Sequence, residues 1–151
     1  MRNLLAILLL FITLLGCSQK NAFKQFHLSS SQELAEDNLQ STKIVNKNNE
    51  VIAIVTALHL NKIDPKRYNR YEYFYVYMYD KNRNEKVNFY VNGMPALLQE
   101  ELPVQNEFTK LTSFHSKWNR YYLVGFAKQQ KNLNLKIQLG EGAATLLFKQ
   151  Y

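Results

Sequence analysis

At residues 71–79 the chain reads Tyr-Glu-Tyr-Phe-Tyr-Val-Tyr-Met-Tyr, with a tyrosine at every odd position. Successive side chains of a strand point to opposite faces of a sheet, so the five tyrosines would share one face. The opposite face would carry Phe74, Val76 and Met78, which are ordinary core residues. This period of two predicts a half-buried β-strand with one apolar and one aromatic face.

The same period recurs along the chain on both sides of this stretch. Its clearest example is residues 133–139, where Leu133, Leu135 and Ile137 alternate with polar residues. Turn-forming residues separate the alternating segments. The predicted strands cover residues 42–45, 51–60, 71–79, 87–91, 120–127, 133–139 and 144–148.

About seven short strands with turns between them predict an all-β fold of antiparallel strands. No segment of helical length and period lies between consecutive strands, which argues against a parallel sheet with crossover helices. An immunoglobulin-like β-sandwich is the expected architecture, and a closed barrel is the alternative. Residues 94–117 lack a clear period and are expected to form loops with short strands or a helical turn.

The first sixteen residues have the pattern of an export signal. Arg2 supplies a positive start, and residues 4–15 form an apolar run that only Thr13 interrupts. This run is shorter than the ~20 apolar residues that a helix needs to span a bilayer. The pattern predicts a signal peptide over residues 1–16, which is removed on export.

The end of this segment, Leu14-Leu15-Gly16-Cys17, resembles the lipobox of bacterial lipoproteins. The resemblance implies that Cys17 carries a thioether-linked diacylglycerol and an N-acyl chain, and that the mature chain begins there. In lipoproteins of two-membrane bacteria an Asp after the cysteine signals retention at the inner membrane. Ser18 therefore implies the outer membrane, facing the periplasm or the cell surface. The chain also looks like small lipoproteins with β-sandwich ectodomains.

The mature chain divides into a lipidated stalk, residues 17–40, and a β-domain, residues 41–151. Ser30 and Glu33 have the spacing of a capping box, which indicates one short helix near residues 31–39. The alternative for the stalk is an unstructured tether. Cys17 is the single cysteine, so the β-domain must fold without a disulfide. A domain of this length buries enough surface to do so.

The chain is basic, with a formal net charge of +7. This charge favours anionic neighbours such as lipid headgroups, envelope polymers or an acidic protein. A secreted, membrane-tethered domain rarely meets nucleic acid, so no nucleic-acid partner is expected. The basic residues are scattered along the sequence, which is also typical of an ordinary solubilising surface.

No catalytic motif of a known class is present in the sequence. His27, His59 and His115 lie in different segments, and Glu100 and Glu101 are adjacent, so an extended chain would point them apart. No histidine pair or cysteine cluster offers metal-ligand spacing. We therefore expect no catalytic residue, no metal and no small-molecule cofactor apart from the lipid on Cys17.

The tyrosine face is the strongest candidate for a binding surface. Tyrosine offers a large, stiff contact area with a polar tip. Basic residues at 66, 67 and 70 precede the strand, which suits a glycan or a protein of the envelope. The alternative is that the tyrosines pack against neighbouring segments as core. The candidate surface comprises Tyr71, Tyr73, Tyr75, Tyr77 and Tyr79.

The sequence thus predicts a lipid-anchored envelope lipoprotein with a non-catalytic structural or binding role. The alternatives are an envelope hydrolase and an inhibitor or chaperone of an envelope enzyme. Trp118, just before a predicted strand, fits either a core position or an exposed anchor.

Overall fold

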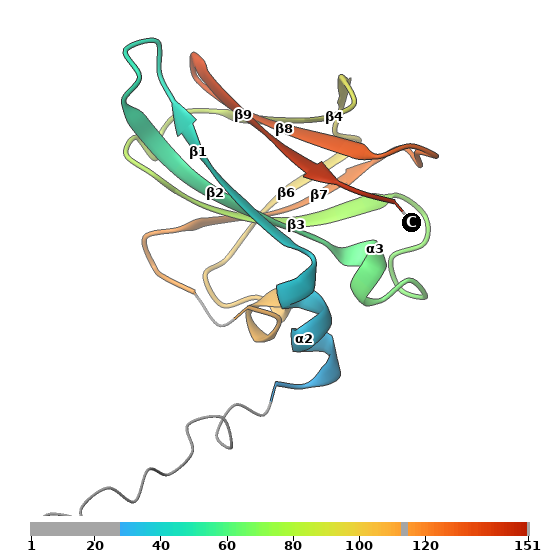
Figure 1. The fold of residues 1–151 in the computed structure, drawn as a ribbon. Helices are drawn as coiled ribbons and strands as arrows, with labels where there is room; N and C mark the ends of the chain where they lie inside the picture. The colour runs from blue at the N-terminus through green and yellow to red at the C-terminus, as the bar shows by residue number, and fades with distance from the viewer. Residues whose placement is uncertain (1–27, 113–114, 151) are drawn as a thin grey trace, which may run out of the picture.

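The computed structural model describes residues 28–112 and 115–150. Within these ranges nine antiparallel strands form one sheet, in the order β5-β4-β8-β9-β1-β2-β3-β7-β6. The sheet curls so that its two halves face each other (Figure 1). The elements in chain order are α2 (Ser30–Asp37), β1 (Leu39–Val45), β2 (Val51–His59), α3 (Leu60–Ile63), β3 (Glu72–Asp80), β4 (Val87–Val91), β5 (Met94–Pro95), β6 (Leu98–Leu102), the 3₁₀ helix η2 (Glu107–Lys110), β7 (Arg120–Phe126), β8 (Leu133–Leu139) and β9 (Gly142–Phe148).

The predicted all-β class is therefore confirmed. The finer expectation of a seven-stranded, immunoglobulin-like sandwich is not, because the strands form one hydrogen-bonded sheet and two further short strands are present. Both additional strands, β5 and β6, lie in the stretch for which the sequence shows no clear period.

Residues 94–102 connect the two ends of the strand order. The beginning of this segment pairs with β4, and its end pairs with β7. Between the two pairings, the Ala96 N–H donates to the Phe89 carbonyl (3.1 Å) and the Leu97 N–H to the Gly125 carbonyl (2.8 Å). One continuous segment therefore joins the two edges of the curled sheet.

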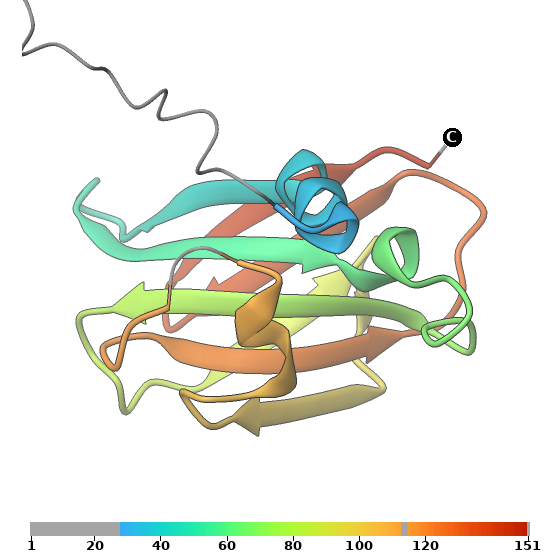
Figure 2. The ribbon, with the colours of Figure 1, turned by 90° about the horizontal axis from the view of Figure 1, so that it is seen from below.

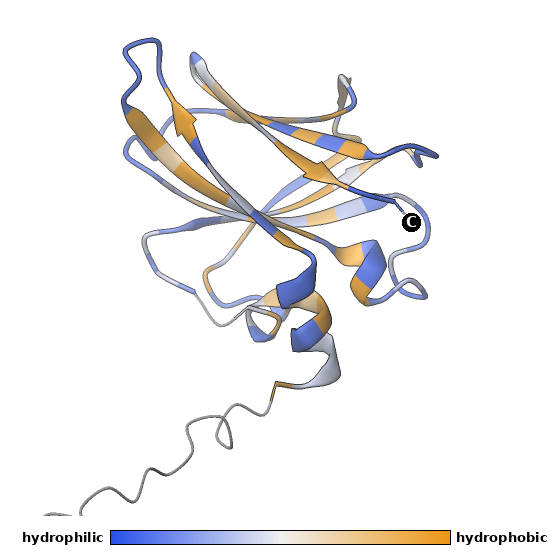
Figure 3. Ribbon diagram, viewed as in Figure 1, coloured by the Kyte–Doolittle hydropathy of each residue, from blue (hydrophilic) through white to orange (hydrophobic). Residues whose placement is uncertain are grey.

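The main hydrophobic core lies inside the curl, between the two facing halves of the sheet. Phe74, Val76 and Met78 of β3 are fully buried there, as the alternation predicts. The opposite half contributes the apolar positions of β8, which alternate with polar residues that face outward. Figure 3 shows this alternation as changes of hydropathy along the strands. Burial of these side chains stabilises the fold by about 1.5–3 kcal/mol each.

A second, smaller core lies on the outer face of β2, β3 and β7. Figure 2 shows α2 and η2 lying over this face. Ala35 of α2, Phe108 of η2 and Leu60 of α3 are buried there against tyrosines of β3 and β7. The helical segments thus cover much of the aromatic face of β3.

Helix α2 covers Ser30–Asp37, where the sequence indicates one short helix near residues 31–39, and its cap lies one residue before the predicted one. The Ser29 hydroxyl accepts from the Gln32 N–H (3.4 Å), while the Gln32 side-chain oxygen accepts from the Ser29 N–H (2.8 Å). Ala35 is buried against the sheet, and β1 already begins at Leu39. The folded part therefore starts before residue 41, where the sequence places the domain boundary.

Candidate functional site

The tyrosines of β3 differ widely in exposure. Tyr75 is fully buried and Tyr77 is 8% exposed, whereas Tyr79 at the end of the strand is 49% exposed. Tyr71 and Tyr73 are half-buried, and their rings pack edge to face with centroids 5.6 Å apart. The middle of the predicted five-tyrosine surface is therefore packed core, and only its far end presents a free ring.

The buried tyrosines are held by rings from other elements. The ring centroid of Tyr75 lies 4.9 Å from that of Phe108 in η2 and 6.2 Å from that of Tyr121 in β7. Burial raises the pKa of the Tyr75 and Tyr77 hydroxyls above the ordinary value, so both are neutral at physiological pH. The centre of this face accordingly stabilises the domain.

The exposed end of the tyrosine face forms one wall of an apolar depression, which we call the aromatic groove. It has a volume of about 520 Å³, and β2, β3 and the loop before β7 supply its walls. Ile54 lies opposite Tyr79, and Thr56 lies opposite Tyr77, in the pairing of β2 with β3. The lining residues are Ile54, Thr56, Tyr77, Tyr79, Ser116, Trp118 and Asn119.

Three large apolar side chains of the groove are exposed together. Ile54 is 48% exposed, Tyr79 49% and Trp118 61%. Single exposed apolar residues are common on protein surfaces, but a contiguous group around a depression is typical of an interaction site. Tryptophan and tyrosine are also the residues that most often dominate binding energy at interfaces.

The segment that carries Trp118 is held by Arg83, by Tyr121 and by a hydrogen bond within the segment itself. The Arg83 guanidinium donates to the carbonyls of Lys117 (3.0 Å) and Asn119 (3.3 Å). The Trp118 N–H donates to the Ser116 hydroxyl (3.2 Å), and the hydroxyl of Tyr121 bonds to the Ser116 backbone. The groove is therefore largely formed before any ligand arrives, which lowers the entropic cost of binding.

The groove has a neutral lining and a basic rim. None of its lining residues is charged. Lys43 of β1 pairs with Ile54 in register and is exposed, and the Lys117 ammonium lies 5.2 Å from the centre of the Trp118 ring. This arrangement suits a partner that brings apolar side chains flanked by carboxylates.

The described candidates for catalysis lie on separate elements: His59 at the end of β2, Glu100 and Glu101 in β6, and His115 in the loop before β7. His59, at the end of β2, has its Nε2 atom 2.9 Å from Glu72 Oε2, and both side chains are buried. Burial alone would raise the pKa of Glu72, but the bond from His59 and the charge of Lys128 lower it below its usual value. In the described ranges, no three His, Cys, Asp or Glu side chains gather as metal ligands.

The remaining predicted residues are scattered or lie outside the described residues. Glu101 forms an ion pair with Arg120 (3.2 Å). Arg67, in the basic stretch before β3, pairs with Glu107 of η2. His27 and the lipidation residue Cys17 lie outside the described residues.

Trp118 is the functional candidate that the sequence suggested only in part. Its place before β7 left its exposure open, and it lines one depression with Tyr79 although the two residues are far apart in the sequence. The tyrosine at position 121, paired with Tyr77 in the sheet, links the two segments.

Comparisons with known proteins add no further assignment. Protein-family models, curated proteins and solved structures were all searched, and none matches the chain. Among the described residues, no helix has both the length and the apolar character needed to span a membrane.

Proposed function

We propose that this chain is a lipid-anchored lipoprotein of the bacterial envelope whose β-domain is a non-catalytic binding module. The aromatic groove is the binding site, and its occupant is an acidic segment of an envelope protein. The observation that carries this proposal is the group of Ile54, Tyr79 and Trp118, three exposed apolar side chains around one preformed depression.

A protein segment suits the groove for two reasons. Its lining is mainly apolar and neutral, so an aliphatic or aromatic side chain gains free energy by leaving water there, about 25 cal/mol for each Å² buried. The exposed lysines beside it, Lys43 and Lys117, would attract carboxylates and raise the rate of association. Envelope hydrolase activity has less support. The buried His59–Glu72 pair borders an open depression, but among the described residues no serine, threonine or cysteine lines that depression as a nucleophile.

The anchor is the second part of the proposal. Cys17 would carry a diacylglycerol and an N-acyl chain, and two or three acyl chains hold a protein firmly on a bilayer. Ser18 favours the outer membrane. The facing halves of the curled sheet support the finer description of the ectodomain as a β-sandwich.

The anchor is tested with Cys17→Ala in cells fed a radiolabelled or clickable fatty acid. We expect the variant to lose the label and to accumulate as uncut precursor. Ser18→Ala is the matched control, because it leaves the cysteine intact and should be labelled normally. Labelling that persists in Cys17→Ala would refute the anchor.

The groove is tested by site-specific photo-crosslinking in cells. A benzoylphenylalanine at position 118 samples the groove, and one at position 147 samples an exposed leucine of β9 as the control. We expect one stoichiometric product from position 118 only, abolished by Tyr79→Ala, with an acidic, apolar segment of a protein at the crosslink. Equal products from both positions, or crosslinks only to lipid or glycan, would refute the protein-binding role.

A further inference from the structure

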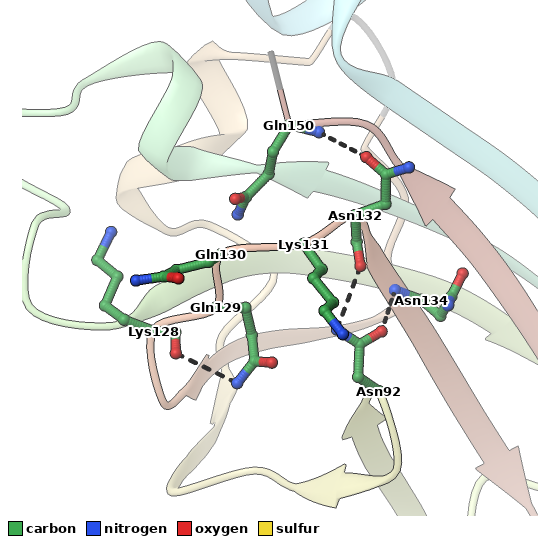
Figure 4. A pocket seen from close by; sticks show the side chains of 8 residues that line it. All are labelled: Asn92, Lys128, Gln129, Gln130, Lys131, Asn132, Asn134 and Gln150. Atoms are coloured by element: carbon green, nitrogen blue, oxygen red, sulfur yellow. Dashed lines mark hydrogen bonds between the residues drawn. The ribbon is translucent and has the colours of Figure 1, made fainter.

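A second depression lies at the opposite end of β3 and has a different chemistry. Its volume is about 890 Å³, and polar residues line it (Figure 4). They come from the turn after β4, the β7–β8 loop, the start of β8 and the segment after β9. Six of them carry side-chain amides: Asn92, Gln129, Gln130, Asn132, Asn134 and Gln150. We call this depression the amide pocket.

Hydrogen bonds between its own residues fix the frame of the amide pocket. The Asn92 side chain donates to the Asn132 carbonyl (3.2 Å) and accepts from the Asn134 N–H (3.0 Å). The Asn132 side-chain oxygen accepts from the Gln150 N–H (3.1 Å) and so ties the C-terminal segment to the β7–β8 loop. Asn92 has a positive φ of 50°, in the left-handed region that asparagine adopts more readily than most residues.

Other amides of the pocket are left available for a ligand. The side chains of Gln130, Asn134 and Gln150 form no hydrogen bond with another described residue, and they border the depression in Figure 4. Each offers one acceptor and two donors. Three such groups on a fixed frame can meet several polar atoms of one ligand at once.

The charge of the pocket argues against a phosphate or another compact anion. Two lysines line it, Lys128 and Lys131, but the Lys128 ammonium lies 3.5 Å from the Glu72 carboxylate, which offsets its charge. Lys131 is then the one lining lysine without a nearby carboxylate among the described residues, and a single positive charge attracts a dianion only weakly. Within the described part of the chain, no carboxylate lines the pocket to attract a cation.

We infer that the amide pocket binds an oligosaccharide, through its hydroxyl and acetamido groups. A sugar hydroxyl both donates and accepts hydrogen bonds, and a side-chain amide complements both functions in one group. The inference does not depend on the aromatic groove, which lies on a separate part of the surface and is lined by different residues.

The test is a titration of the intact lipidated protein in nanodiscs, followed by NMR of the asparagine and glutamine side-chain NH₂ groups. The probes are triacetylchitotriose, maltotriose and inorganic phosphate. We expect saturable shifts of the pocket amides with at least one trisaccharide, at a Kd of about 1 mM. Fluorescence of Trp118, the single tryptophan, should not change.

Two variants and one control define the outcome. Gln130→Ala with Asn134→Ala should weaken sugar binding about tenfold, through the loss of two polar contacts. Gln138→Ala, an amide on the same strand but outside the pocket, should leave it unchanged. Lys131→Gln should also retain sugar binding, and this variant keeps the test decisive if the double variant does not fold.

Several results would overturn the inference. No saturable shift with either sugar at about ten times the expected Kd would do so. An unchanged Kd in the folded double variant would show that these amides do not hold the sugar. Phosphate binding without sugar binding, lost in Lys131→Gln, would assign the pocket to an anion instead.

Discussion

Tyr121 and Ser116 are joined by two hydrogen bonds through a single hydroxyl group. The Tyr121 hydroxyl donates to the Ser116 carbonyl at 2.9 Å and accepts from the Ser116 N–H at 2.7 Å. Tyr121 is buried in β7 and packs near Tyr75 and Tyr77, so the rigid sheet fixes its position. These two hydrogen bonds therefore restrain the loop that carries Trp118 against the sheet.

Tyr121→Phe is expected to loosen this loop without unfolding the domain. Phenylalanine keeps the ring packing but leaves both backbone groups of Ser116 without their partner, at a cost of about 1–2 kcal/mol. Fluorescence anisotropy of Trp118 should fall, and chemical denaturation should give the loss of stability. An unchanged anisotropy would show that other contacts alone hold the loop.

Tyr77→Ala should mainly reduce stability, whereas Tyr79→Ala should mainly reduce binding in the groove. Tyr77 is buried, so its truncation should destabilise the domain by about 3 kcal/mol, as for other buried aromatic residues. Tyr79 is half exposed, and its truncation should change stability by less than about 1 kcal/mol. Denaturant titration measures both, and photo-crosslinking from position 118 should be lost in the Tyr79 variant. Equal stabilities would mean that Tyr77 is not core.

Because the pKa of Glu72 is lowered in the folded state, we expect the domain to lose stability in acid. Its pKa in the folded state lies below the ordinary value of about 4.3, because His59 and Lys128 together outweigh the effect of burial. As the pH falls below about 5, the unfolded state takes up the proton first, so the free energy of unfolding decreases. The contribution of Glu72 to the free energy of unfolding is complete at higher pH. It disappears once Glu72 is protonated in both the folded and the unfolded state.

Glu72→Gln is the variant that isolates this effect. Glutamine keeps the shape and one hydrogen-bonding oxygen but cannot titrate. The free energy of unfolding, measured from pH 6 to pH 3 (a range that spans about one unit on either side of the ordinary pKa), should fall less steeply than in the unmodified protein. Glu107→Gln, which removes an exposed carboxylate, is the control. Identical slopes for Glu72→Gln and the unmodified protein would contradict the assignment.

Val76→Asp should unfold the domain or lower its melting temperature strongly. Val76 is fully buried in the inner core, where an aspartate would have no ionic partner and would lose its hydration. Thr145→Asp on β9 places the same charge at an exposed strand position and should melt normally. Thermal circular dichroism compares the two. A normal melting curve for Val76→Asp would mean that the inner face of β3 is misassigned.

The sequence predicted the long, regularly alternating strands well. Leu133–Leu139 has its predicted bounds and its predicted buried face, because one side of β8 meets the core and the other meets solvent. Strand β6 was expected only as an unplaced short strand within residues 94–117. Leu98–Leu102 has three polar residues between two leucines, and β6 lies at the end of the strand order. An edge position of this kind leaves little hydrophobic pattern in the sequence.

The candidate site was only partly predictable for a related reason. The alternation correctly predicted that tyrosines share one face of β3. That face is covered by α2 and η2, however, and both are far from β3 in the sequence. Phe108 in η2 carries no pattern that would assign it to this face. The groove likewise depends on a loop and two strands that meet only through the pairing of the sheet.

The segment that joins both ends of the strand order bears on whether neighbouring molecules pair through their sheets. Unpaired strand edges invite backbone pairing between neighbouring copies, and lipid anchors would concentrate those copies in the plane of the membrane. Here the backbone edges of β4 and β7 are already paired with one stretch of the same chain, residues 94–102. Even at high surface density, neighbouring copies therefore have little opportunity to pair with β4 or β7. The exposed aromatic rings remain available for a different partner.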